Sequence, residues 1–314
     1  MLNRRHIRVK VMQSLFSYKG GEGDDLTPSI KFLNHSINGM YDLFLLMLAI
    51  LPEIHGKAEV YLNKSQLKHL ATKAEKDPNK KFIENQILIS LSENTALKEE
   101  LKKRKLTNWT VDDEYIDILF KEILRSQNYQ EYMNSRLSSF TEDLDFVVSI
   151  FKDVIAPNEK LYEYIEDKKL TWLDDLPLVN TTILKLLRKT KSDSPSSHFL
   201  PPLYKDEEDM TFATELFTNT VLNSGSFSEE IASRTKNWDS ERIAALDSVL
   251  LKMAICEFQK FPSIPVKVTI NEYLEIAKEY STPKSSVFIN GILDKLVGEY
   301  KVDGKLNKTG RGLK

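Results

Sequence analysis

The sequence is poor in the residues that mark disulfide-rich, metal-binding or turn-rich proteins. Its 314 residues include one cysteine, Cys256, so neither an intrachain disulfide nor a cysteine-rich metal site can form. Cys256 lies in the apolar run VLLKMAICEF, which favours a buried, unreactive thiol over a nucleophile. Glycine and proline number only eleven each. Because no alternating strand pattern is present either, the sequence predicts an all-α protein.

Catalytic and cofactor-binding motifs are also missing. The five histidines lack the paired spacing of metal ligands, and no HExxH motif occurs. No GxxxxGK(S/T), GxGxxG or GxSxG motif is present, so the sequence contains neither a phosphate-binding loop nor a nucleophile elbow. We therefore expect a protein that is not an enzyme and that uses no cofactor or metal.

Long apolar segments are absent as well. The most hydrophobic stretch, YDLFLLMLAIL at 41–51, is shorter than the roughly 20 residues that span a bilayer, and it predicts a buried helix. The basic N-terminus is not followed by an uninterrupted apolar segment, so we expect no signal peptide. A cytoplasmic protein with no membrane partner is the resulting prediction.

The net charge of −2 conceals an uneven distribution of charge. Residues 1–20 contain five basic side chains and no acidic one, and the tail at 301–314 contains five basic residues against Asp303. Two basic ends on an otherwise balanced chain are typical of a nucleic-acid binder. The basic run KEELKKRK at 98–105, in contrast, is interpreted as a solvated helix face.

Helical periodicity recurs along the whole chain. It predicts helices at 4–18, 27–51, 57–75, 80–104, 111–126, 129–155, 158–168 and 177–190. A linker rich in Ser and Pro follows at 192–209, and further helices are expected at 210–222, 226–236, 239–260, 269–280 and 283–299.

A weak internal repeat crosses that linker at an offset of 66 residues. Five residues of the first segment coincide with identical residues of the second: Phe146, Phe151, Ile165, Trp172 and Leu184 with Phe212, Phe217, Ile231, Trp238 and Leu250. Either the segment is duplicated, or two amphipathic helix pairs of similar length coincide by chance. The sequence leaves both explanations open.

The first predicted helix, RRHIRVKVMQSLFSY, places arginines at its N-terminal end, where the helix dipole disfavours cations. At 100° per residue, a core-facing stripe contains Ile7, Val11, Leu15 and Tyr18, and Lys10 points roughly the opposite way. The edge beside the stripe contains Arg5, Arg8, Met12 and Phe16. Guanidinium groups with an aromatic ring suit phosphate and base contacts, but arginines paired with acids elsewhere would give the same pattern.

Local signals also predict how the last two helices begin and pack. Thr269 and Glu272 have the spacing of a capping box. Thr282 followed by Pro283 predicts the start of the final helix. Gly291 lies inside that helix at an energetic cost, which predicts close approach by a neighbouring backbone.

The C-terminal segment resembles the NusB family of transcription antitermination factors. IPVKVTINEYLEIAK is similar to the family pattern IPxKVAINEAxELAK, and SSVFINGILDKL to SxxFVNGVLDKI. The preceding WDSERIAALDSVLLKMAICEF resembles the family's helix before these motifs. The arginine-rich start resembles the family's first helix, RxxARExAxQALYxxx. The resemblance covers about 1–18 and 207–299.

This resemblance implies an RNA-binding antitermination factor with a NusB-like helical bundle and an additional helical lobe. The implied partners are NusE, boxA-type single-stranded RNA and the transcription elongation complex, in support of ribosomal RNA transcription. The resemblance implies RNA contacts at Arg4, Arg5, Arg8, Phe16, Tyr280, Lys284 and Phe288. It implies NusE contacts at Glu241 and Asp247.

The expected domain layout follows the same resemblance. Residues 1–19 would form the first helix of the core, 20–206 an inserted helical lobe, 207–300 the remaining core, and 301–314 a flexible basic tail. Two alternatives stay open. One is a helical protein–protein scaffold that has lost RNA binding. The other is part of an RNA methyltransferase system, which would require strands and a glycine-rich loop.

Overall fold

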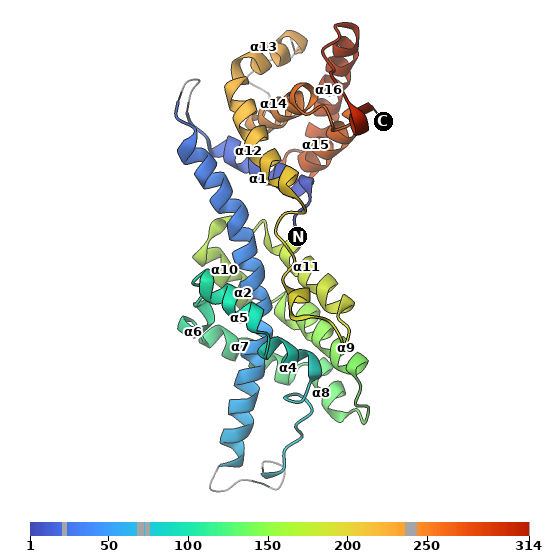
Figure 1. The fold of residues 1–314 in the computed structure, drawn as a ribbon. Coiled ribbons are helices and arrows are strands. Elements are labelled where there is room, and N and C mark those ends of the chain that lie inside the picture. Colours follow the sequence, from blue (N-terminus) through green and yellow to red (C-terminus); the bar gives the residue numbers. More distant parts are fainter. Residues whose placement is uncertain (21–23, 68–71, 73–75, 236–243, 314) are drawn as a thin grey trace. The chain divides into compact units, whose positions relative to one another are not determined.

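The computed structural model describes residues 1–20, 24–67, 72, 76–235 and 244–313 (Figure 1). Every regular element in these ranges is a helix or a single helical turn, so the all-α prediction is confirmed. The strands that a methyltransferase domain requires do not occur in the described part of the chain. Packing contacts divide the chain into two compact units: Met1–Ile37 with Leu203–Lys314, and Asn38–Pro202.

The first unit is built around its N-terminal helix, α1 (Arg4–Ser17), which packs against three others. The elements of this unit are α12 (Glu207–Leu222), α13 (Ser224–Arg234), α14 (Ala245–Lys260), α15 (Val266–Tyr280), α16 (Ser285–Val302) and the turn η5 (Gly310–Leu313). The three helices against α1 are α12, α14 and α15 (Figure 1). The first helix is therefore a central element of the bundle.

Contact with three helices buries more of α1 than the periodicity of its sequence predicts. Every side chain from Ile7 to Met12 is buried, including Lys10, which the periodicity placed on the opposite face. Leu15 and Tyr18 are half-buried. Periodicity therefore predicts the burial of Ile7 and Val11 but not that of Lys10, because a helix with neighbours on several sides buries more than one face.

The second unit is organised around α2 (Thr27–Gln66), whose stretch from Leu43 to Leu51 is almost completely buried. The indole N–H groups of Trp109 and Trp172 donate to the carbonyls of Leu46 and Gly39 of this helix, at 2.8 and 2.7 Å. Around it lie α4 (Gln86–Ser92), α5 (Thr95–Lys103), α6 (Asn108–Val111), α7 (Glu114–Arg125), α8 (Gln127–Asn134), α9 (Phe140–Ile150), α10 (Glu159–Lys168) and α11 (Leu176–Lys189). Three short turns complete the unit: the π-helical turn η1 (Phe151–Ile155), η2 (Leu170–Trp172) and η3 (Ser196–Phe199).

The length of α2 corrects the expected division into helices at 27–51 and 57–75. The helix continues through Pro52, although an internal proline costs about 3 kcal/mol. Ile50, Leu51 and Ile54 are fully buried on either side of it, and their burial offsets that cost. By length and composition α2 could cross a membrane, but 78% of its most apolar window is buried inside the protein, as in a core helix.

Polar caps divide other stretches that periodicity predicts as single helices. The Asn94 side chain accepts a hydrogen bond from the Leu97 backbone, which separates α4 from α5 within the predicted 80–104. Ser139 likewise accepts from the Glu142 backbone and starts α9 inside the predicted 129–155. The sequence pattern therefore located the helical regions but not these breaks.

The starts of α15 and α16 differ from the predictions. The first begins at Val266 after Pro265, so Thr269 lies one turn inside the helix and forms no cap. The last helix begins at Ser285, whose hydroxyl shares a 2.8 Å hydrogen bond with that of Thr282. A methyl group added at Gly291 would meet nothing within 4 Å, so the predicted close approach of a neighbouring backbone is wrong.

The 66-residue repeat extends to the order and packing of the helices. Adding 66 to 140–155, which form α9 and η1, gives 206–221, close to the bounds of α12. The same shift places α10 on α13 and most of α11 on α14, and α9 contacts α11 as α12 contacts α14. Asp143 and Asp209 also coincide, and both are buried. Trp238 lies outside the described residues.

Residues of the expected linker and of the tail make hydrogen bonds to other parts of the chain. Within the predicted linker, Phe199 is buried, and the Ser196 carbonyl accepts a 3.0 Å hydrogen bond from Asn94 Nδ2. In the tail, the Thr309 backbone donates to the Pro262 carbonyl at 3.0 Å. Both segments therefore contact the helices beside them.

Candidate functional site

The N-terminus of α1 begins with a reciprocal cap. The Asn3 side chain accepts from the His6 backbone at 3.1 Å, and His6 Nδ1 accepts from the Asn3 backbone at 3.3 Å. These bonds pair the backbone N–H groups of Asn3 and His6, which would otherwise lack partners at the helix start, and they fix where the helix begins. The three arginines that follow are therefore held in a defined orientation.

Arg8 is the innermost of them. Its Nε and Nη2 donate to the two carboxylate oxygens of Glu257 on α14 at 2.9 and 2.7 Å, and the two side chains are 2% and 0% exposed. Thr269 and Tyr273 of α15 also donate to this carboxylate, at 2.7 and 3.2 Å. Burial is the largest single influence and acts to lower the pKa of Arg8, but the charge and hydrogen bonds of Glu257, together with the charge of Glu272, outweigh it, and the pKa is raised. The guanidinium remains charged inside the core.

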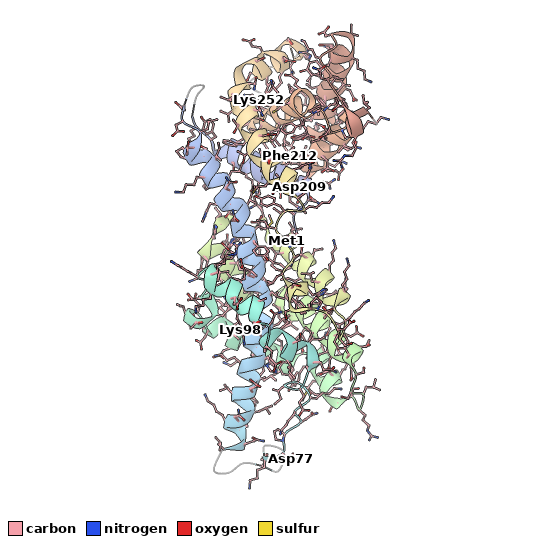
Figure 2. The ribbon with its side chains drawn as sticks, viewed as in Figure 1. Met1, Asp77, Lys98, Asp209, Phe212 and Lys252 are labelled. Atoms are coloured by element: carbon pink, nitrogen blue, oxygen red, sulfur yellow. The ribbon has the colours of Figure 1, made fainter. Side chains whose placement is uncertain are left out.

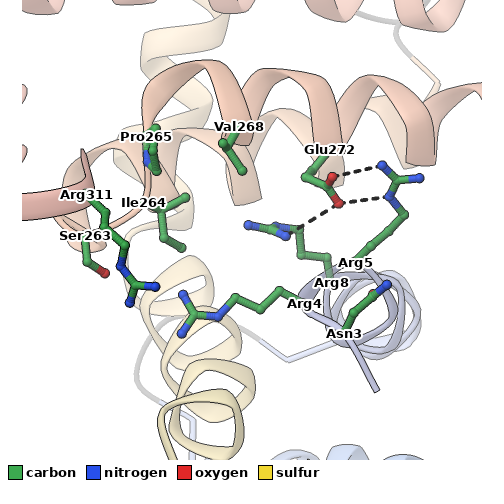
Figure 3. A pocket seen from close by; sticks show the side chains of 10 residues that line it. All are labelled: Asn3, Arg4, Arg5, Arg8, Ser263, Ile264, Pro265, Val268, Glu272 and Arg311. Carbon is green, nitrogen blue, oxygen red and sulfur yellow. Dashed lines mark hydrogen bonds and ion pairs between the residues drawn. The ribbon is translucent and has the colours of Figure 1, made fainter. Parts of the chain in front are cut away.

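Arg5 lies nearer the surface. Its Nε and Nη2 form two 2.9 Å hydrogen bonds with Glu272 of α15 (Figure 3). These hydrogen bonds raise the pKa of Arg5 and lower that of Glu272. Glu275 and Glu279, further along α15, add to the negative potential at Arg5. Arg5 thus stands at the end of a row of carboxylates.

Arg4 is paired with α12. Its Nε donates to the buried carboxylate of Asp209 at 2.8 Å, and its Nη2 donates to Glu208 at 3.2 Å. The guanidinium carbons of Arg4 and Arg8 each lie 5.2 Å from the ring centre of Phe212, a cation–π distance. Asp209 and Phe212 are about one turn apart on α12 (Figure 2).

A pocket of about 540 Å³ opens beside these arginines. Arg4, Arg5 and Arg8 line it from α1, and Arg311 lines it from the C-terminal tail (Figure 3). The remaining lining residues are Asn3, Ser263, Ile264, Pro265, Val268 and Glu272. Arg4, Arg5 and Arg311 can offer an anion charge-assisted hydrogen bonds there, and the buried Arg8 adds positive charge.

The other residues predicted to contact RNA lie in different surroundings. Phe16 is 57% exposed, three turns beyond Arg5 on α1. Lys284 is exposed, and Tyr280 and Phe288 are half-buried around the start of α16. The predicted Arg5–Arg8–Phe16 edge is therefore not one exposed surface, because Arg8 belongs to the core and the other two are separated along the helix.

The structure describes one of the two residues that the sequence predicts to contact a protein partner. Glu241 lies outside the described residues. Asp247 is buried and accepts hydrogen bonds from the hydroxyls of Ser281 and Ser285, at 2.6 and 2.7 Å. Its carboxylate thus connects the start of α14 to the loop that carries Lys284.

Sequence reasoning missed the carboxylates that hold the arginines and the tail residue at the pocket. Glu257 carried a usable signal, since an acid inside the apolar run KMAICEF needs a buried cation or hydrogen-bond donors. Arg311 had no such signal, because its position depends on how the tail folds back. Among the described residues, no group of three or more His, Cys, Asp or Glu side chains could hold a metal ion.

The fold and the site define a helical bundle organised around an arginine-rich first helix. A model described as the NusB family matches residues 187–298. A transcription antitermination protein NusB from Salinibacter ruber is 45% identical over 112 residues, which are 36% of this chain and 70% of that protein. The NusB protein of Geotalea uraniireducens is 35% identical over 116 residues, 37% of this chain and 77% of that protein.

The chain belongs to the NusB family, and it is a transcription antitermination protein rather than an enzyme. A third relative, NusB from Chloroherpeton thalassium, is 39% identical over 128 residues, 40% of this chain and 61% of that protein. No solved structure matches the chain at a significant level. Most of the second compact unit lies before the matched residues.

Proposed function

We propose that this protein, together with NusE, binds boxA-type single-stranded RNA and supports transcription of ribosomal RNA operons in the cytoplasm. The observation that carries the proposal is the pocket lined by four arginines at the start of α1. The RNA backbone supplies phosphates, which guanidinium groups bind through paired hydrogen bonds. We propose that this assembly of protein, NusE and RNA acts on the transcription elongation complex.

Arg4 and Arg5 are the proposed phosphate ligands of the first helix. Arg4 uses Nε for Asp209 and Nη2 for Glu208, and Arg5 uses both atoms for Glu272. A guanidinium has five N–H donors in total. Further donors therefore remain for a ligand. Arg8 acts differently: it is buried against Glu257 and positions α1, and it contributes charge without reaching solvent.

The aromatic side chains extend the proposed RNA surface. Phe16 offers an exposed ring on which a base could stack, and Tyr280 and Phe288 offer partly exposed rings near Lys284. Asp247 holds the loop of Lys284 in place through Ser281 and Ser285. We propose that NusE contacts the region before and at the start of α14, with Asp247 acting through this loop.

The domain layout is part of the proposal. The NusB core comprises the compact unit Met1–Ile37 with Leu203–Lys314, and Asn38–Pro202 is a helical insertion into it. Most of this insertion lies before residue 187, where the match to the family model begins.

The test is an electrophoretic shift titration of the full chain on boxA-type RNA and a scrambled sequence, with and without NusE. Arg4→Ala and Arg5→Ala should each weaken binding, and each lost phosphate contact should reduce the salt slope by about 0.7. Arg188→Ala, which removes an exposed arginine of α11, is the matched control and should bind like the wild type. Equal binding of native and scrambled RNA would refute the proposal.

One observation favours a second candidate function, a scaffold that captures NusE without RNA. Arg4, Arg5 and Arg8 are each paired with a carboxylate, so RNA must compete with internal acids for the first two. NusE binding without measurable affinity for RNA, in the same titration, would identify this function.

A further inference from the structure

The C-terminal tail is anchored to the end of α14 by specific contacts. Lys308 Nζ donates to the carbonyls of Glu257 and Phe261 at 3.2 and 3.0 Å, in the last turn of that helix and just after it. A cation at a helix C-terminus is favoured by the helix dipole and by the unpaired carbonyls there. The Thr309 backbone then donates to the Pro262 carbonyl at 3.0 Å.

Gly312 completes this anchor. It is buried, and a Cβ at this position would lie 2.0 Å from the Pro262 carbonyl oxygen, far inside any van der Waals contact. The Gly312 backbone also donates to the Thr309 carbonyl at 2.8 Å, which closes a turn. The side chain between these two residues, Arg311, is thereby placed at the edge of the pocket (Figure 3).

Arg311 is loosely held by protein groups. Its side chain is 76% exposed, and its Nη2 lies 3.9 Å from Glu208 Oε2, at the limit of an ion pair. The same Glu208 oxygen accepts from Arg4 Nη2 at 3.2 Å. Two guanidinium groups, from opposite ends of the chain, therefore share one exposed carboxylate oxygen at the pocket.

The charges around Arg5 show from which side a phosphate can approach. On α15, Glu272, Glu275 and Glu279 form the carboxylate row that acts on Arg5, and this row repels a phosphate. Glu272 also lines the pocket, whose other lining residues include Arg4, Ser263, Ile264 and Arg311. The electrostatically favourable approach is therefore through the part of the pocket lined by Arg4 and Arg311.

We propose that the tail is part of the nucleic-acid site, with Arg311 and Arg4 binding one RNA phosphate between them in place of Glu208. This inference rests on the proposed RNA-binding function. It goes beyond the family resemblance, because Arg311 lies after the matched residues 187–298. The bidentate geometry of two guanidinium groups suits a phosphate with two free oxygens.

The experiment measures binding of the full-length protein to boxA-type RNA by fluorescence anisotropy at several salt concentrations. Arg311→Ala should weaken binding several-fold and lower the salt slope by about 0.7. Gly312→Ala keeps the net charge but displaces the tail, so it should weaken binding in the same way. Lys301→Ala, at an exposed position of α16, removes one positive charge away from the pocket and should bind like the wild type.

The outcomes separate this inference from the function on which it rests. Weakened binding by Arg5→Ala with wild-type binding by Arg311→Ala overturns the role of the tail and leaves the proposed function intact. An equal loss of RNA affinity in Arg311→Ala and Lys301→Ala also overturns the role of the tail, since the change in net charge alone then explains the weaker binding. Wild-type binding by Gly312→Ala, with its circular dichroism unchanged, overturns the positioning of Arg311 by the tail. Failure of the wild type to prefer boxA RNA overturns both proposals.

Discussion

Arg8 and Glu257 form a doubly hydrogen-bonded ion pair in the core of the first unit, although 249 residues separate them in sequence. The pair connects the first helix to α14, and Thr269 and Tyr273 of α15 complete the hydrogen bonding of the carboxylate. The arginine-rich first helix and the C-terminal helices α14 and α15 therefore meet in one buried polar cluster. Thr269, which sequence spacing assigns to a helix cap, is instead part of this cluster.

Removing one partner of this pair should destabilise the protein strongly. Arg8→Ala leaves the Glu257 carboxylate buried without its cation, which typically costs about 3–5 kcal/mol. Arg8→Lys should also lose stability, because an ammonium cannot form the two parallel hydrogen bonds. Urea unfolding followed by circular dichroism measures the effect, with Arg188→Ala as the surface control. A wild-type midpoint for Arg8→Ala would contradict the structural role of the pair.

The Arg5–Glu272 pair should make stability depend on acid pH. Hydrogen bonds from Arg5 lower the pKa of Glu272 below its ordinary value of 4.5. The carboxylate therefore stabilises the fold above that value, and the contribution is lost as the pH falls through the lowered pKa. Wild type should exceed Glu272→Gln in stability at neutral pH, and the two unfolding midpoints should converge in acid. A gap that persists undiminished as the pH falls far below 4.5, until the carboxylates are protonated, would rule out this titration as the cause.

Cys256 should be unreactive toward thiol reagents in the folded protein. Its thiol is fully buried, and burial raises its pKa to about 12. Because the thiolate is the reactive form, a thiol reagent at neutral pH should label the protein only after unfolding. The same sample in denaturant supplies the control for reagent activity. Rapid labelling of the native protein would show that this part of the core opens readily.

Gly291→Ala should stabilise the protein. The position is exposed in the middle of α16, and a methyl group there meets no atom within 4 Å. Alanine in a helix interior is more favourable than glycine by about 0.5–1 kcal/mol. Thermal unfolding measures the gain, and Gly312→Ala, which would clash with Pro262, should move the midpoint in the opposite direction. A lower midpoint for Gly291→Ala would indicate a backbone requirement that the packing does not reveal.

Sequence periodicity predicts the helical class and locates most helical regions because it depends on local side-chain pattern. It fails where tertiary packing overrides that pattern. Pro52 signals a break, but the buried side chains around it hold α2 together as one helix. At α1, periodicity assigns one buried face, whereas contacts with three helices bury Arg8 and Lys10 as well.

The candidate site was predictable only in part for the same reason. The arginines at the start of the chain were identified from their charge at an unfavourable helix end. Their partners, Asp209, Glu257 and Glu272, lie more than 200 residues away, and no local rule joins such positions. Arg311 depends on a tail that folds back through Lys308 and Gly312.

Each unit contains a helix start at which the residue after an Asn cap donates to a buried aspartate. In the first unit, the residue after the Asn3 cap is Arg4, which donates to the buried Asp209 at 2.8 Å. In the second, the residue after the Asn85 cap is Gln86, whose backbone and side chain donate to the buried Asp143 at 3.0 and 3.2 Å. An amide thus occupies the place of a guanidinium. Of these two donors to a buried aspartate, Arg4 is the one that carries a positive charge, and it lines the pocket.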